Sequence, residues 1–177
     1  MDQDDHLKLI SATALGDRQA FARLYQQTSG KLLAVCLKML GNRALAEEAI
    51  QDAYVKIWHN AADYQHHKGS VLTWMVSIAR YRALDILRYQ KVRKEDALTG
   101  ESAPLEESDD RFADLDAGHK LSQCINELPQ EHQQAIHLAY FNGLSHQEVV
   151  HYLDKPLGTI KSWIRRGLQQ LQRCLTP

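Results

Sequence analysis

Residues 144–175 read LSHQEVVHYLDKPLGTIKSWIRRGLQQLQRCL and contain the strongest structural signal in the chain. Ser145 is a good helix N-cap, and Glu148, three residues later, completes a capping box. The segment 154–156, Asp-Lys-Pro, then breaks this short helix, and its proline suits the first turn of a second helix. We therefore predict a helix-turn-helix.

The second helix of this pair has two unlike sides. Apolar residues recur at steps of three and four and predict a buried stripe of Ile160, Ile164, Leu168, Leu171 and Leu175. The opposite side carries small polar residues and arginines, namely Gly158, Thr159, Ser162, Arg165, Arg166 and Gln169. Arginines bind phosphate or guanine edges, and small residues allow a helix to approach a major groove closely. This side predicts a DNA-reading helix, and a solvated helical hairpin without that role is the alternative.

The composition favours an all-α protein. Aromatic residues make up 7% of the 177 residues, and no run alternates in Val, Ile and Thr as a strand would. No apolar run is long enough to span a membrane. The first residues, MDQDDH, lack the basic and apolar parts of a signal peptide, so we expect a cytoplasmic protein without direct membrane insertion.

The formal net charge of −1 hides an uneven distribution along the chain. Residues 1–92 hold 12 Lys and Arg against 9 Asp and Glu, and residues 119–177 hold 6 against 4. Between them, residues 93–118 hold 3 against 9. Two mildly basic parts therefore flank an acidic one, and nucleic-acid binding stays open despite the near-neutral total.

The acidic segment 93–118 also contains Gly100, Pro104 and Gly118 and has little apolar periodicity, which is typical of a flexible linker. We predict two small helical domains, residues 1–92 and 119–177, joined by this linker. The helices expected in the first domain span residues 5–15, 18–40, 44–62 and 70–91. Those expected in the second domain, before the helix-turn-helix, span residues 120–128 and 130–142.

We expect neither a metal nor another cofactor. Cys36, Cys124 and Cys174 are odd in number and lie far apart in helical patterns, so we expect reduced structural thiols rather than a disulfide framework or a zinc site. The histidine pairs 132/137 and 146/151 are spaced by five residues, not by the four that place two ligands on one helix face. No nucleophile triad or phosphate-binding loop has a compelling context, so we expect no catalytic activity.

The helix predicted over residues 44–62 joins a small-residue core side to a mixed surface. Its core side carries Ala46, Ala49, Ile50, Ala53 and Ile57. The other side carries Glu48, Gln51, Asp52, Val55 and His59, with Trp58 at the flank. A valine among polar residues, beside a large aromatic residue, suits a protein–protein surface. A core Trp58 beside an ordinary exposed Val55 is an equally good interpretation.

The helix predicted over residues 70–91 follows a polar loop, residues 63–69, which contains His67 and Lys68. Its core side carries Leu72, Met75, Ala79, Ala83 and Ile86. Another side carries Thr73, Trp74, Ser77, Arg80, Tyr81 and Arg88. Interleaved aromatic residues and arginines can hold unstacked bases and their phosphates, whereas the alternative is a charged solvent face with one half-buried tryptophan.

Three motifs in a fixed order make the chain recognisable. They are AEEAIQDAYVKIW at 46–58, WMVSIARYRALDILR at 74–88 and, after the acidic linker, LSHQEVV…PLGTIKSWIRRGLQQL. Over nearly its whole length the chain closely resembles bacterial extracytoplasmic-function (ECF) sigma factors, the small two-domain members of the main sigma family of RNA polymerase.

The resemblance implies a protein that binds core RNA polymerase, at the β′ clamp helices and the β subunit, and directs it to promoter DNA. The polymerase contacts that it implies are Glu48, Gln51, Asp52, Val55 and Trp58. The implied contacts to the single strand of the −10 element are His67, Lys68, Trp74, Ser77, Arg80 and Tyr81. The implied contacts to the −35 element are Lys161, Ser162, Arg165 and Arg166. It also implies control by an anti-sigma factor.

Four positions depart from the family's usual pattern. Tyr81 replaces a common Asn, Trp163 stands where an Arg is frequent, Asp154 replaces a common turn Gly, and Val150 replaces a common Ala. A helix-turn-helix regulator without sigma activity is the alternative function. That alternative explains the C-terminal motif equally well, but it leaves the two upstream motifs without a role.

Overall fold

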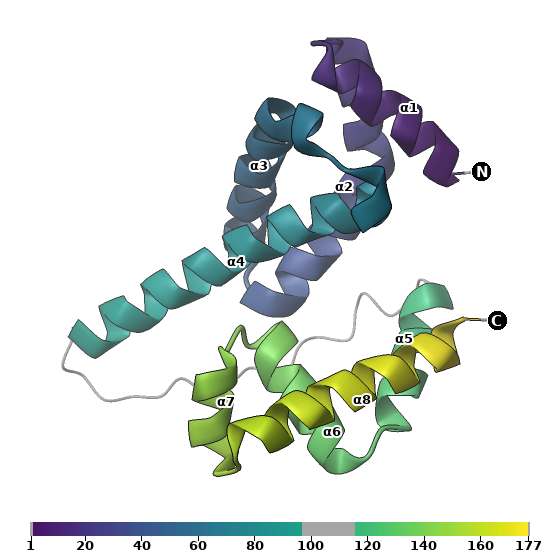
Figure 1. Ribbon diagram of the computed structural model, residues 1–177. Helices are drawn as coiled ribbons and strands as arrows, with labels where there is room; N and C mark the ends of the chain where they lie inside the picture. Colours follow the sequence, from purple (N-terminus) through teal and green to yellow (C-terminus); the bar gives the residue numbers. More distant parts are fainter. Residues whose placement is uncertain (1, 97–115, 177) are drawn as a thin grey trace. The chain divides into compact units, whose positions relative to one another are not determined.

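The structure is a computed structural model, and it describes residues 2–96 and 116–176 (Figure 1). The chain divides into two compact units, Met1–Glu106 and Glu107–Pro177. The described residues form helices and no strand, which confirms the predicted all-α fold. None of the helices in these ranges is long and apolar enough to cross a lipid bilayer.

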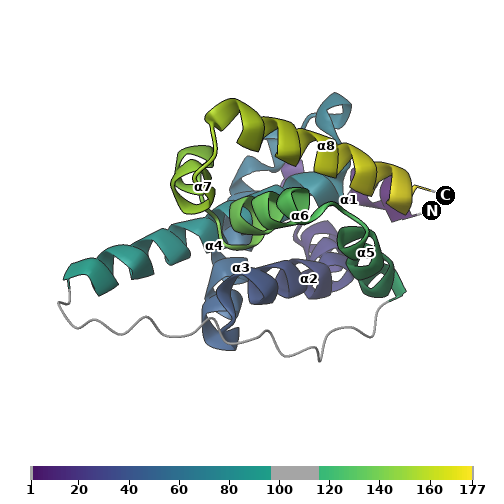
Figure 2. The ribbon, with the colours of Figure 1, turned by 90° about the horizontal axis from the view of Figure 1, so that it is seen from below.

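The first unit consists of α-helices and two short 3₁₀ turns. In chain order they are α1 (Asp2–Ala14), α2 (Arg18–Leu40), α3 (Arg43–Asn60), η1 (Ala61–Asp63), η2 (His66–Lys68) and α4 (Val71–Asp96). α3 packs against both α2 and α4, and α1 packs against α2. The C-terminal part of α4 extends beyond the other helices of this unit (Figure 1 and Figure 2).

Capping residues set both ends of α2 and the start of α3. The side chain of Asp17 accepts hydrogen bonds from two backbone N–H groups in the first turn of α2, at 2.8 and 3.1 Å. Gly41 ends α2 in the left-handed conformation, with a φ of 61°. The side chain of Asn42 then accepts the backbone N–H of Leu45 and starts α3. The tight Gly-Asn turn therefore places α2 and α3 side by side.

Small residues allow α3 and α4 to lie close together. The alanines buried in these two helices are Ala46, Ala49, Ala53, Ala79 and Ala83. Larger side chains complete this core, among them Leu24, Leu32, Ile57, Val71 and Met75. Every residue predicted for the core side of α3 is buried, and in α4 only Leu72 of the predicted set is partly exposed.

The second unit is organised around its last helix. In chain order its elements are α5 (Asp116–Asn126), α6 (Gln130–Ile136), a π-helical turn η3 (His137–Phe141), α7 (His146–Leu153) and α8 (Leu157–Leu175). α8 packs against α5, α6 and α7. α7 lies at the N-terminal end of α8, and α5 lies nearer its C-terminal end (Figure 1 and Figure 2).

The predicted helix-turn-helix is confirmed. The hydroxyl of Ser145 accepts the backbone N–H of Glu148, and the Glu148 carboxylate accepts the backbone N–H of Ser145 at 2.6 Å, which completes the capping box. Asp154 ends α7 with a φ of 51°, and among the described residues it is the only non-glycine with a positive φ. Aspartate tolerates this left-handed conformation, so the turn keeps a glycine-like geometry without glycine.

The buried stripe predicted for α8 is only partly right. Its buried members are Ile160, Ile164 and Leu171. Leu168 and Leu175 are each 37% exposed. Gly167 occupies a buried position instead, and a Cβ there would lie 2.5 Å from Cδ1 of Ile136 in α6. Because Gly167 has no side chain, the Ile136 side chain of α6 lies close against the backbone of α8 there, and the neighbouring Leu168 is left partly exposed.

The expectation of three reduced cysteines is wrong for two of them. A disulfide joins Cys124 of α5 to Cys174 of α8, whose Cα atoms lie 5.9 Å apart. The two cysteines are 50 residues apart in the sequence, so only the packing of α5 against the end of α8 brings them together. Cys36 is the free thiol, and it is fully buried in the first unit.

The predicted helices differ from the observed ones mainly at their ends. α2 has the predicted bounds, but α4 continues to Asp96 and α5 begins already at Asp116. The single helix predicted over residues 130–142 is α-helical to Ile136 and continues as the π-helical turn η3. The first four N–H groups and last four C=O groups of a helix lack partners within it, so sequence periodicity locates helix ends poorly.

The acidic segment that was predicted as a linker, 93–118, lies mostly in the range 97–115, outside the described residues. Its flexibility and the domain limits drawn from it stay predictions.

Candidate functional site

The outward side of α3 carries four of the predicted polymerase contacts. Glu48 and Gln51 are exposed, and Asp52 is half-buried. Val55 is 57% exposed, which leaves most of an apolar side chain in solvent. These four residues, here called the α3 patch, follow one another at helical spacing. They combine carboxylates with exposed apolar surface, the mixture expected where two proteins meet.

Trp58 differs from the four residues of the α3 patch. It is half-buried, and its ring meets the ring of Phe21 in α2 edge-on, with centroids 5.2 Å apart. The structure therefore supports a mixed interpretation, in which Trp58 packs against α2 and also borders the α3 patch.

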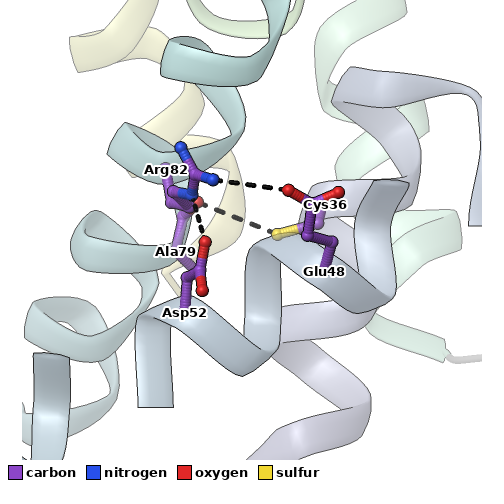
Figure 3. Close-up of polar contacts among 5 residues, drawn as sticks. All are labelled: Cys36, Glu48, Asp52, Ala79 and Arg82. Atoms are coloured by element: carbon purple, nitrogen blue, oxygen red, sulfur yellow. Dashed lines mark hydrogen bonds and ion pairs between the residues drawn. The ribbon is translucent and has the colours of Figure 1, made fainter. Parts of the chain in front are cut away.

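Arg82 of α4 joins two acids of the α3 patch (Figure 3). Its Nε donates to Oδ2 of Asp52 at 2.6 Å, and its Nη2 donates to Oε1 of Glu48 at 3.4 Å. The Arg82 side chain is 26% exposed, and the Asp52 and Glu48 side chains are 46% and 56% exposed. Two carboxylates on one helix face therefore share a cation that comes from another helix.

Cys36 lies at the contact of α2 with α4. Its Sγ lies 3.8 Å from the backbone carbonyl oxygen of Ala79, to which the thiol donates (Figure 3). Burial raises the pKa of the Cys36 thiol to about 11, because a thiolate would be poorly solvated there. Cys36 is therefore a packing residue rather than a nucleophile.

The predicted single-strand contacts begin in the turn before α4. His67 and Lys68 lie in η2 and are exposed. Tyr64 connects this turn to α4, because its hydroxyl donates to the carbonyl of Gly69 at 2.8 Å and its ring meets the ring of Trp74 with centroids 5.7 Å apart. Tyr64 thus holds the turn against the first part of α4.

Along α4, the predicted contacts differ in how much of them is accessible. Tyr81 is 63% exposed, whereas Trp74, Ser77 and Arg80 are half-buried. The hydroxyl of Ser77 donates its proton to the carbonyl oxygen of Trp74 at 2.7 Å. An external ligand can therefore bind to the lone pairs of this hydroxyl but not to its proton. Trp74, Ser77 and Tyr81 follow at steps of three and four and share one side of the helix.

The predicted contacts in α8 lie away from the buried side of that helix. Lys161, Arg165 and Arg166 are exposed, and Ser162 is half-buried. Trp163, which stands where the family often has an arginine, is partly buried against the core formed around Ile160 and Ile164. The indole therefore contributes packing at this position.

Two family models and several curated relatives match this chain. The family model of Sigma-70 region 2 matches residues 24–93, and that of Sigma-70, region 4 matches residues 118–171. The ECF RNA polymerase sigma factor SigK of Mycobacterium tuberculosis is 32% identical over 171 residues, which cover 94% of this chain and 91% of the relative. SigK of Mycobacterium ulcerans is 32% identical over 176 residues, which cover 97% and 94%. The chain belongs to the ECF RNA polymerase sigma factors.

Two solved structures are similar to this ECF sigma factor as well. Rhodobacter sphaeroides SigE, in complex with the anti-sigma ChrR, is 29% identical with a TM-score of 0.47, and the match covers 98% of this chain and 99% of that one. CnrH, in complex with the cytosolic domain of CnrY, is 17% identical with a TM-score of 0.46, over 97% and 96% of the two chains.

The matched regions contain all the predicted contact residues of this ECF sigma factor. The α3 patch, η2 and the first part of α4 lie in the region 2 match, and the basic side of α8 lies in the region 4 match. The polymerase and DNA contacts of the individual residues stay predictions, since each rests on the family resemblance and on exposure.

Sequence reasoning missed two residues of this sigma factor that organise its surfaces, Arg82 and Tyr64. Arg82 lies three residues after Ala79 and four before Ile86, at the edge of the core side of α4. A cation at such an edge needs a partner, and this was the available signal. No comparable sequence signal existed for Tyr64, because its ring contact with Trp74 depends on how the loop folds back.

Proposed function

We propose that this ECF sigma factor binds core RNA polymerase and directs it to promoters with a −35 and a −10 element. One observation carries the proposal: matches to regions 2 and 4 occur in order, and each contains exposed side chains of the required chemistry. Residues 1–92 bind the polymerase and the −10 element, and residues 119–177 bind the −35 element. The polymerase performs the chemistry, and the sigma factor has no catalytic activity of its own.

The α3 patch is the proposed polymerase-binding surface, with Trp58 at its border. Glu48 and Asp52 provide negative charge, and Val55 provides apolar area. Such a surface suits a helical partner that carries cations beside apolar side chains. The proposed partner is the pair of β′ clamp helices, with further contacts to the β subunit.

The turn η2 and the first part of α4 form the proposed −10 surface. Trp74 and Tyr81 offer aromatic rings on which unstacked bases can stack. His67, Lys68 and Arg80 place hydrogen-bond donors and positive charge beside them. Ser77 contributes lone pairs to a base edge. This combination holds a single strand whose bases have left the duplex.

The exposed basic side of α8 is the proposed −35 surface. Lys161, Arg165 and Arg166 can reach phosphates or guanine edges when the helix lies in the major groove, and Ser162 is small enough to allow that approach. Each half of the protein alone binds DNA weakly, and attachment of both halves to one polymerase raises their effective concentration.

An anti-sigma factor is the proposed regulator. Rhodobacter sphaeroides SigE was solved in complex with the anti-sigma ChrR, and CnrH was solved in complex with the cytosolic domain of CnrY. We propose that an anti-sigma partner of this chain covers the surfaces described above in the cytoplasm and so prevents polymerase binding.

Transcription in vitro tests the proposed function directly. Sigma-free bacterial core polymerase is mixed with genomic promoter fragments, with and without this protein. Discrete start sites that require the protein support the proposal and reveal the promoter. If neither initiation nor binding to core polymerase occurs, the protein is instead a helix-turn-helix regulator that binds DNA without sigma activity.

A further inference from the structure

Arg82 lies directly after Tyr81 in the sequence but points to α3 (Figure 3). Its guanidinium uses two different nitrogens, Nε for Asp52 and Nη2 for Glu48. The arginine is the least exposed of the three side chains, at 26%. Its position is therefore set by packing between the helices, and the two carboxylates converge on it.

Without this arginine, the two acids would repel each other. Glu48 and Asp52 stand four residues apart on α3, a spacing at which like charges destabilise a helix and drive the side chains apart. The single cation neutralises one of the two charges, so the group keeps a net charge of −1. A planar guanidinium can serve two carboxylates at once, which a lysine ammonium does less well.

The bonds to Arg82 leave part of each carboxylate available. They use Oδ2 of Asp52 and Oε1 of Glu48, and the two acid side chains are 46% and 56% exposed. An ionised carboxylate offers about four lone-pair sites over its two oxygens. A pair of half-exposed acceptors with a residual negative charge is therefore held in one arrangement on the α3 patch.

We propose that Arg82 is a positioning residue of the polymerase-binding surface, which holds Asp52 and Glu48 ready to accept a cationic side chain of the polymerase. This inference rests on the function proposed above for the α3 patch. It assigns Arg82 to polymerase binding, although the residues just before it are assigned to DNA. Pre-organised acceptors bind more tightly because less side-chain freedom is lost when the complex forms.

Binding of the full-length protein to core polymerase tests the proposal with four variants. They are Arg82→Gln, Arg82→Lys, Asp52→Asn and the double variant Arg82→Gln/Asp52→Asn. We expect Arg82→Gln to weaken the affinity for core polymerase about tenfold, as for loss of a charge-assisted contact. Arg82→Lys keeps the positive charge but not the planar guanidinium, so this variant should bind core polymerase more tightly than Arg82→Gln and less tightly than the unaltered protein. In the Asp52→Asn background, Arg82→Gln should cost less affinity than in the unaltered protein, since one of the two positioned acids is already absent.

Two controls separate positioning from other roles. Arg43→Gln removes an exposed pair with Glu47 on the same α3 helix, at 2.8 Å, and should leave the affinity for core polymerase within about twofold, as expected for a surface ion pair. Binding of an unpaired −10 oligonucleotide is measured with polymerase saturated by each variant. We expect Arg82→Gln to bind this oligonucleotide like the unaltered protein once the complex has formed.

Each failure has a distinct meaning. If Asp52→Asn keeps full affinity for core polymerase, the proposed polymerase-binding role of the α3 patch is overturned, and so is the positioning role of Arg82. If Asp52→Asn weakens binding but Arg82→Gln does not, only the positioning role is overturned. It is also overturned if the two losses add independently or if Arg82→Gln impairs the oligonucleotide step alone. Should Arg82→Gln fold poorly by circular dichroism, the Arg82→Lys affinity decides, and full affinity in that variant would contradict the need for a guanidinium.

Discussion

Cys124 and Cys174 form a disulfide that joins α5 to the last turns of α8. The bond connects the start of the second unit to the helix whose other end carries the proposed −35 surface. Because Leu128, which follows α5, is buried in one cluster with Leu171 of α8, the disulfide reinforces a contact that already has an apolar core.

Replacement of Cys174 by serine should destabilise the second unit. Loss of a cross-link over 50 residues is expected to cost about 2–4 kcal/mol of unfolding free energy. Hydrogen exchange of the amides in α5 and α8 measures the effect unit by unit. Dithiothreitol should accelerate exchange there in the unaltered protein and have no further effect in Cys174→Ser.

The number of reactive thiols provides an independent check of the same bond. Cys36 is buried and its thiol has a pKa of about 11, so the folded protein should react slowly with thiol reagents. Denatured without a reductant, the chain should show one thiol per molecule, and after reduction all three. Three thiols without reduction would contradict the disulfide.

Gly167→Ala should destabilise the second unit because its Cβ would lie 2.5 Å from Cδ1 of Ile136. Cδ1 is the far end of the Ile136 side chain, but Ile136 is buried, so the side chain has little room to move away. Overpacking of this kind costs about 1–3 kcal/mol, against a gain in helix propensity of about 1 kcal/mol. Gly158→Ala is the matched control on the same helix, because a Cβ there meets nothing within 4 Å. Urea unfolding should rank Gly167→Ala below both the unaltered protein and the control, and equal midpoints would argue against close packing at this position.

Tyr54 should make the first unit less stable at alkaline pH. Burial raises the pKa of Tyr54 to about 12 in the folded protein, above the ordinary value of 10.0. Between these values the unfolded chain loses the phenolic proton while the folded one keeps it, so stability is full below pH 10 and falls as the pH rises toward 12. Such a group contributes a slope of about 1.4 kcal/mol per pH unit.

Tyr54→Phe should remove this alkaline slope from the unfolding free energy. At neutral pH the variant should lose about 1 kcal/mol, because the hydroxyl of Tyr54 no longer bonds that of Thr28 at 2.7 Å. Tyr152→Phe is a suitable control, since this ring is 69% exposed and lies in the other unit. An unchanged slope in Tyr54→Phe would show that another group dominates the alkaline transition.

Arg166→Ala and Asp52→Ala should separate the two activities of the protein. Arg166→Ala should weaken binding to the −35 duplex about tenfold and leave the affinity for core polymerase unaltered. Asp52→Ala should do the reverse in the same pair of assays. Equal loss of both activities in Arg166→Ala would remove this residue from the DNA surface and indicate a folding defect.

Much of the helical framework follows from local sequence. The capping box of Ser145 and Glu148 and the bounds of α2 were predictable, because caps, breakers and apolar periodicity act over a few residues. The buried side of α3 was predictable for the same reason. The site residues on α3, α4 and α8 came from motifs, and the structure adds that Trp58, Trp74 and Ser77 are partly engaged within the fold.

The helical class, the helix-turn-helix and the family of the chain all follow from its sequence. Three relationships instead depend on tertiary packing: Cys124 with Cys174, Gly167 with Ile136, and Arg82 with Asp52. Each joins residues about 30 or more positions apart on different helices. The period of a helix tells which residues share its own face, but the partner across a contact depends on how two helices pack against each other.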